Sequence, residues 1–295
     1  MVGKTVHSSA AELVRYHEQH LSNGDYHLEE GKVQGEFVGA LADEWSLSTK
    51  AIVMDDARFR AFADLNLAWL SGLKLGRPRR SERQAVEFAY SAPKSVGIAA
   101  VHDARVAGEM SAAVKEELKW FESFACCRDR RGELYNSEAA RKTGKMLAAT
   151  FVHETSRAQD PSLHMHVLIA NVTIDPERKE ALAMSYGEMF EMRKTLDARI
   201  HNKLARRLRV LGYTIEVAEN GFRLREIPAA IEEIYSVRSK GIATAKELLK
   251  DAYTIRQLSD ALRGRVGARE KRAVDNRQDP RTVRRSRAPR GPAYR

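Results

Sequence analysis

Three of the nine histidines in the 295-residue chain lie close together in sequence: His153, His164 and His166. Residues 163–171 have the apolar pattern of a strand, and its two-residue period puts the imidazoles of His164 and His166 on one face. His153 ends the preceding predicted strand, residues 145–153, and antiparallel pairing would bring it beside the other two. Three imidazoles on one face predict a metal site with open positions for substrate. Imidazole suits Zn, Cu, Ni and Mn better than Mg, so the ligand type alone leaves the ion open.

Helices and strands are mixed in the rest of the chain. Helical spacing or a capping signal predicts helices after Ser9-x-x-Glu12, within residues 56–72, over residues 104–126, and from Ser185-x-x-Glu188 to Gly212. Alternation or a turn signal predicts a strand at Ala85–Ser91 and a hairpin over Thr214–Arg225. Because the clearest strand pairs are joined as hairpins, we expect an α+β fold with an antiparallel sheet.

Positive charge is concentrated at the C-terminal end of the chain. The net charge is +10, and Lys271–Arg295 holds nine Lys or Arg against two Asp or Glu, with no Leu, Ile, Phe, Met or Trp. Such a segment cannot bury a core, so we expect it to be disordered, either as a phosphate-binding arm or as a solvated linker. We therefore expect one globular domain over residues 1–265 and a basic tail over residues 266–295.

The composition excludes several classes of protein. Hydrophobic residues make up 43% and charged residues 31%, which is a globular balance. No apolar run reaches the ~18 residues of a membrane span, and the start lacks the apolar core of a signal peptide. The two cysteines, Cys126 and Cys127, are too few for a disulfide framework, and we expect buried, reduced thiols in a cytoplasmic protein.

The run His153–Asn171, HETSRAQDPSLHMHVLIAN, closely resembles the histidine-triad motif of conjugative relaxases of the TrwC/TraI (MobF) class. These enzymes belong to the HUH endonuclease superfamily, in which U is an apolar residue, here Met165. Ser91–Val96, SAPKSV, resembles a second segment of the family, and the resemblance covers residues from about 8 to 240. It implies a site- and strand-specific DNA nickase that starts plasmid transfer. The implied fold is an antiparallel, about five-stranded sheet flanked by helices, the HUH-relaxase palm, with a helical C-terminal part that closes over DNA.

The resemblance also implies the nucleophiles. Tyr16, on the first predicted helix, and Tyr26, just beyond it, stand where the family keeps its N-terminal catalytic tyrosines. A phenol with a pKa of about 10 is a weak nucleophile, and a metal ion beside the phosphate favours phenolate and polarises the phosphoryl oxygen. Tyr16 would form a 5′-phosphotyrosyl bond, and Tyr26 would serve a second transfer. The family often pairs its tyrosines, whereas here His17 and His27 follow them.

Glu87 is a further departure from the family, whose relaxases usually carry Asp four residues before the first Ser of the SAPKS segment. On the predicted strand Ala85–Ser91, Glu87 points away from Val86, Phe88 and Tyr90. It keeps the carboxylate and adds one methylene. We expect it either to orient a ligand imidazole or to take the phenol proton. An ordinary ion pair on the strand face is the structural alternative.

Five basic residues are candidate DNA phosphate contacts: Arg77, Arg79, Arg80, Lys94 and Arg157. The resemblance implies single-stranded and hairpin DNA at a transfer origin as the partner, together with other relaxosome and coupling proteins. It implies one divalent ion, Mg or Mn in use, while Zn, Ni or Cu also suits a three-His site. Family members commonly continue into a helicase, whose phosphate-binding loop this sequence lacks. The implied location is the bacterial cytoplasm, with carriage into the recipient cell on the DNA.

Three other functions stay open. The first is a rolling-circle replication initiator of the same superfamily. The second is a three-His metal hydrolase that uses water and leaves Tyr16 idle, and the third is a non-catalytic origin-binding protein. A covalent adduct between protein and DNA separates the nickase from the last two.

Overall fold

In the computed structural model of the chain, the residues described are 3–21, 34–48, 51–52, 57–73, 83–128, 140–156, 160–219 and 221–236, without the side chains of 16–21. All of them belong to one compact unit, Met1–Ser236. Within these ranges, no helix combines the length and the apolar composition needed to cross a membrane. The predicted boundary between residues 265 and 266, and the basic tail after it, lie outside the described residues.

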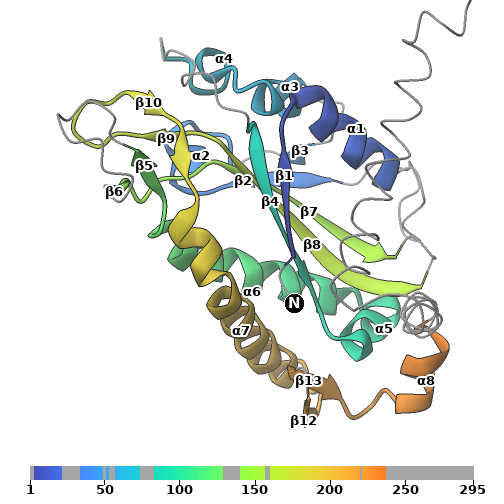
Figure 1. Cartoon of the computed structure of the whole chain (residues 1–295). Coiled ribbons are helices and arrows are strands. Elements are labelled where there is room, and N and C mark those ends of the chain that lie inside the picture. The colour runs from blue at the N-terminus through green and yellow to red at the C-terminus, as the bar shows by residue number, and fades with distance from the viewer. Residues whose placement is uncertain are drawn as a thin grey trace, which may run out of the picture. The chain divides into compact units, whose positions relative to one another are not determined.

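A six-stranded antiparallel sheet forms the centre of this unit (Figure 1). Its strands lie in the order β1 (Gly3–His7), β4 (Ala85–Ser91), β8 (Pro161–Ala170), β7 (Ala148–Thr155), β2 (Gly35–Val38) and β3 (Ala51–Ile52). The predicted α+β fold with an antiparallel sheet is confirmed, and β4 has its predicted bounds. The edge strands β1 and β3 were not predicted, because strands of five and two residues carry too little pattern of their own.

One face of the sheet is covered by long helices (Figure 1). These are α5 (Lys94–His102), α6 (Ala104–Glu122) and α7 (Gly187–Val210). Val86, Phe88 and Tyr90 of β4 pack in this layer together with Met165 and Val167 of β8, as the alternation predicted. The intervening residues of both strands, which include Glu87 and the histidines, therefore face the other side.

The opposite face carries α1 (Ala10–Leu21), α2 (Ala40–Glu44), α3 (Ala57–Ala63) and α4 (Leu67–Ser71). Leu13 of α1 packs in one core with Phe151 of β7 and Leu168 of β8. Phe151 and Leu168 lie two residues from His153 and His166 along their strands, and so on the same side. The first helix therefore covers the sheet face that carries the histidines.

Residues 56–72, which showed helical spacing, form two helices instead of one. Leu65 has a left-handed φ of 51°, and Asn66 begins α4 by accepting the backbone N–H of Trp69 at 3.3 Å. Phe59 and Phe62 are buried as the spacing predicted, whereas Trp69 is 50% exposed. The break turns the second helix, so the apolar period does not continue through it.

The capping box predicted at Ser185 is wrong. Helix α7 begins after Tyr186 and has no capping side-chain hydrogen bond. Ser185 belongs instead to β11 (Met184–Ser185), which pairs with β5 (Cys126–Arg128). Tyr186 is buried, and its hydroxyl donates to the carbonyl oxygen of Ile169 at 3.1 Å, which ties the helix start to β8.

The remaining described elements are short: β6 (Ala140–Lys142), β9 (Thr173–Ile174), β10 (Ala181–Leu182), β12 (Ile215–Ala218), β13 (Gly221–Leu224) and α8 (Ala229–Ile234). Strands β12 and β13 form the predicted hairpin. Cys126 and Cys127 are adjacent on β5, are buried and form no disulfide, as predicted. Burial, followed by the nearby carboxylate of Glu188, raises the pKa of the Cys126 thiol to about 11.

Candidate metal centre

The three predicted histidines meet on one face of the sheet. His153 of β7 is the register partner of His164 on β8, and His166 follows two residues further along β8. Their ring centroids are 4.8 to 5.2 Å apart. One ligand nitrogen from each ring lies within 4.8 Å of the other two. Antiparallel pairing thus brings together residues that the loop between the strands separates in sequence.

Hydrogen bonds decide which nitrogen of two of these rings faces the shared centre. Nδ1 of His164 lies 2.6 Å from the carbonyl oxygen of Ser162, and Nδ1 of His166 contacts Oε1 of Glu87. A carbonyl or an ionised carboxylate only accepts, so each Nδ1 carries the proton and each Nε2 keeps its lone pair. Three close imidazoles, two of them in the ligand tautomer, fit a divalent ion with open positions.

Glu87 links this centre to the edge of the sheet. Its carboxylate is 2% exposed, and Oε2 lies 3.1 Å from Nε2 of His7 on β1 while Oε1 contacts His166. Each oxygen therefore accepts from an imidazole, which offsets the loss of water around a buried charge. Of the two roles expected for Glu87, this geometry favours the orientation of His166.

His7 is a site residue that the sequence did not reveal. It is 1% exposed, at the end of β1, whose register with β4 places Thr5 opposite Glu87. A stretch of five residues offers at most two alternations, which is too little to predict a strand. The pairing with β4 spans about 80 residues of sequence, so no local signal could have found the contact.

The two predicted catalytic tyrosines are only partly located. The backbone of Tyr16 lies within α1, on the sheet face that carries the histidines, and its side chain is outside the described part of the chain. Tyr26 falls wholly outside the described residues, so both assignments stay predictions.

Of the five predicted phosphate contacts, only one lies within the described residues. Arg77, Arg79, Arg80 and Arg157 lie outside the described residues. Lys94 is described, at the first turn of α5, and its Nζ donates to the carbonyl oxygen of Pro161 at 2.9 Å. A contact between Lys94 and DNA stays a prediction, but the amine already has a protein partner.

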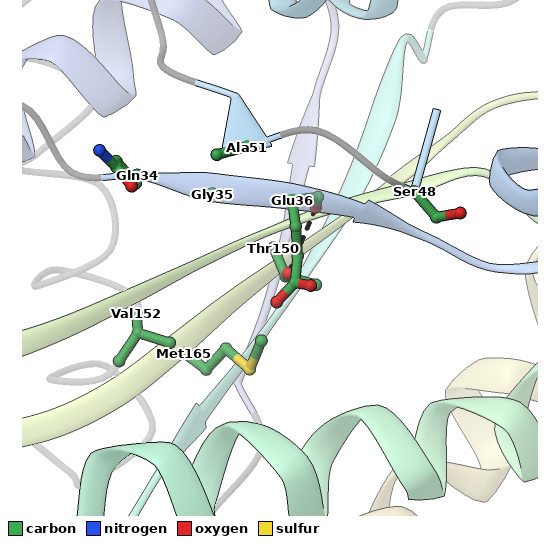
Figure 2. Close-up of a pocket in the computed structure, with 8 residues that line it drawn as sticks. All are labelled: Gln34, Gly35, Glu36, Ser48, Ala51, Thr150, Val152 and Met165. Carbon is green, nitrogen blue, oxygen red and sulfur yellow. Dashed lines mark hydrogen bonds between the residues drawn. The ribbon is translucent and has the colours of Figure 1, made fainter. Parts of the chain in front are cut away.

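A separate cavity lies on the other face of the sheet (Figure 2). It has a volume of about 370 Å³ and is lined by Gln34, Gly35, Glu36, Ser48, Ala51, Thr150, Val152 and Met165. Met165 stands between His164 and His166 in the sequence, so its side chain points away from theirs. This cavity is therefore distinct from the histidine centre.

Comparison with known proteins finds conjugative relaxases. A family model described as TrwC relaxase matches residues 10–289. The multifunctional conjugation protein TraI of Escherichia coli is 33% identical over 176 residues, which cover 55% of this chain and 10% of TraI. TraI of Escherichia coli strain K12 is 30% identical over 176 residues, which again cover 55% of this chain and 10% of TraI. The chain thus spans about a tenth of the length of these relatives.

Solved structures of the conjugative relaxase TrwC are also similar. A copper-bound complex of TrwC with oriT DNA is 27% identical, with a TM-score of 0.72, covering 87% of this chain and 88% of that one. A complex with a 27-mer DNA comprising the recognition hairpin and the cleavage site is 25% identical, with a TM-score of 0.70 and 87% of both chains covered.

Proposed function

The chain belongs to the TrwC relaxase family, and we propose that it nicks and rejoins one DNA strand at a plasmid transfer origin through a tyrosine. The observation that carries this proposal is the histidine centre on the sheet face covered by the Tyr16 helix. Two of its imidazoles already hold the tautomer that a metal ligand needs. The complexes of TrwC with oriT DNA support the choice of substrate.

The proposed reaction exchanges one phosphodiester for another. The phenolic oxygen of Tyr16 attacks the scissile phosphorus, a P–O bond to tyrosine forms, and the bond to the 3′ oxygen breaks. The phenol loses a proton and the 3′ oxygen gains one, so the bond energy is retained and religation needs no ATP. A divalent ion bound by His153, His164 and His166 would supply Lewis-acid stabilisation of the phosphoryl charge.

Within this proposal Glu87 is a positioning residue. Both of its oxygens accept from imidazoles, one from His166 and one from His7. A carboxylate held in this way fixes the orientation of the ligand ring and raises its basicity. The phenol proton then leaves through water, and acceptance of that proton by Glu87 is the alternative that the variants below test.

We also propose the finer features that the sequence and its resemblance to the family imply. The ion in use is Mg or Mn, although Zn, Ni or Cu also suits three imidazoles. Tyr26 serves a second transfer, and Arg77, Arg79, Arg80 and Arg157 contact phosphates. The partners are single-stranded and hairpin DNA, relaxosome and coupling proteins, and a helicase domain. The relaxase domain extends to residue 265, and the protein acts in the cytoplasm and travels with the DNA.

The deciding experiment incubates the chain with single-stranded transfer-origin oligonucleotides and Mn²⁺ and resolves covalent adducts on denaturing gels. Tyr16→Phe removes one oxygen and should reduce the adduct by at least about 10³-fold, with DNA affinity kept. Tyr235→Phe is the matched control, because Tyr235 is partly exposed and lies outside the first helix. Full nicking after exhaustive removal of metal would overturn the metal-dependent part of the proposal.

The other functions give different results in the same assay. Cleavage without an adduct would indicate a three-His hydrolase, and binding without cleavage an origin-binding protein. Peptide mapping that found the DNA on Tyr26 would reverse the two tyrosine assignments. A rolling-circle initiator would form the adduct on replication-origin oligonucleotides and not on transfer origins.

A further inference from the structure

The first turn of α5 lies against the stretch of β8 that leads into His164. The backbone N–H of Ala92 donates to the carbonyl oxygen of Leu163 at 3.0 Å, and Nζ of Lys94 donates to that of Pro161 at 2.9 Å. Ser162, between these two anchored residues, supplies the carbonyl oxygen that accepts from Nδ1 of His164 at 2.6 Å. The partner that sets the tautomer of His164 is therefore held from both sides.

The surroundings of the Lys94 ammonium are acidic. Burial lowers its pKa, and the carboxylates of Asp160 and Glu232 oppose that shift, so both lie close enough to act on its charge. Asp160 is buried immediately before β8, and Glu232 also accepts from Arg223 on β13 at 2.9 Å. A DNA phosphate brought to this amine would meet two like charges and would have to displace the Pro161 carbonyl.

Gly97 also brings α5 into close contact with the backbone of residues 161–163. A Cβ added at this position would stand 3.0 Å from the backbone nitrogen of Leu163 and 3.5 Å from the carbonyl oxygen of Pro161. Helix α5 thus approaches β8 so closely at this point that its backbone and the strand backbone touch. This contact, together with the Lys94 hydrogen bond, fixes the position of residues 161–163 relative to the helix.

We propose that Lys94 is a positioning residue for the metal centre: it holds the Pro161–Leu163 backbone, through which Ser162 orients His164. This inference rests on the proposed function, since it concerns the metal site of that reaction. In this role the lysine of the SAPKS segment supports a metal ligand, His164, and does not contact a DNA phosphate. Lys94 touches neither ion nor DNA in this role and acts through two backbone carbonyls.

The test compares Lys94→Met with Lys115→Met. Lys115 of α6 is also half-buried and pairs with Glu36 of β2 at 2.7 Å. Each variant therefore removes one half-buried positive charge, but only Lys94→Met removes it beside the metal centre. Mn²⁺ affinity is measured by calorimetry, the visible spectrum of bound Co²⁺ reports the ligand geometry, and oligonucleotide affinity is measured in EDTA at several salt concentrations. We expect Lys94→Met to bind Mn²⁺ about 10-fold more weakly with an altered Co²⁺ spectrum, and Lys115→Met to match the unaltered chain.

Oligonucleotide affinity separates the two roles of Lys94. Positioning predicts that Lys94→Met and Lys115→Met bind DNA alike in EDTA, and that Lys94→Arg restores much of the Mn²⁺ affinity. If Lys94 contacts a phosphate, Lys94→Met should bind Mn²⁺ normally and DNA more weakly. The slope of log DNA affinity against log salt concentration should then become shallower by about one. This result would overturn the proposal. Normal binding of both ligands would also overturn it.

A second variant distinguishes a local change in the Pro161–Leu163 backbone from general misfolding. Gly97→Ala changes no charge and pushes on the same backbone, so it should also weaken Mn²⁺ binding and leave DNA affinity in EDTA unchanged. Normal Mn²⁺ binding by Gly97→Ala would count against the proposed path. Failure of the unaltered chain to bind Mn²⁺ would overturn the metal centre of the proposed function, whereas normal binding by Lys94→Met overturns only the role of Lys94.

Discussion

His166 and His164 project from the same strand, two residues apart, but they are held by different means. His166 is held from within the sheet, by the buried carboxylate of Glu87, which His7 supports in turn. His164 is held by a main-chain carbonyl whose position depends on a helix packed against the strand. The first arrangement depends on hydrogen bonds to a buried carboxylate, and the second on backbone geometry. The two ligands should therefore respond differently when their supports are removed.

The largest expected effects come from the ligands themselves. His164→Ala and His166→Ala should each weaken metal binding by more than the ~10–100-fold that loss of a supporting residue costs. His166→Ala also removes a partner of the buried Glu87, so it should lower the stability of the metal-free protein by a further ~1–3 kcal/mol. Thermal unfolding of both variants in EDTA measures this difference, and equal midpoints would contradict the distinction between the two ligands.

Glu87→Gln should give the next largest effect. The amide keeps the shape and loses the charge, so we expect metal affinity to fall by about 10–100-fold. Cleavage at saturating metal should stay close to that of the unaltered chain. Glu87→Asp should be milder, since Asp is the residue that the family usually carries.

Metal titration with rate measurement decides the role of Glu87. A rate loss of about 10²–10⁴-fold at saturating metal, with metal affinity unchanged, would instead indicate proton transfer. The double variant of Glu87→Gln with Lys94→Met sharpens the comparison. Because the two residues support different ligands without sharing a partner, their effects on metal affinity should add.

The smallest effect is expected at His7, which is one contact further from the ion. His7→Leu leaves Oε2 of Glu87 without this donor, so stability should fall by ~1–3 kcal/mol and metal affinity by less than about 10-fold. His7→Gln keeps an N–H donor and should recover part of both. Val6→Ala on the same strand, at a position 42% exposed, controls for changes in the strand itself. Unchanged metal affinity in the His7→Leu chain would contradict the expectation that β1 supports the metal centre.

The sequence predicted the part of the site that depends on strand periodicity. The alternation in Ala85–Ser91 and around His164 placed Glu87 and the histidines on one face, and the structure agrees. It could not predict His7, because β1 pairs with β4 across a long stretch of chain. Nor could it predict the partner of Lys94, since the charge suggested DNA and only the tertiary packing of α5 on β8 brings it to Pro161.

Helix boundaries show the same limit. The apolar spacing within residues 56–72 predicted the burial of Phe59 and Phe62, but it did not reveal the left-handed Leu65 that separates the two helices. Ser185 has the residue type of a helix cap, yet pairing with β5 gives its backbone another role. At Ser185, local propensity was overridden by pairing with a strand that is distant in sequence.

The adjacent thiols on β5 have a practical consequence for experiments on this protein. The chain has only two cysteines, both are buried, and the pKa of Cys126 is about 11, so little thiolate is present near neutral pH. A cysteine introduced at an exposed position, such as Val217 on the hairpin, would therefore react far faster with a maleimide dye than either native thiol. Site-specific fluorescent labelling, and with it single-molecule observation of the proposed strand cleavage, needs no prior removal of the native cysteines.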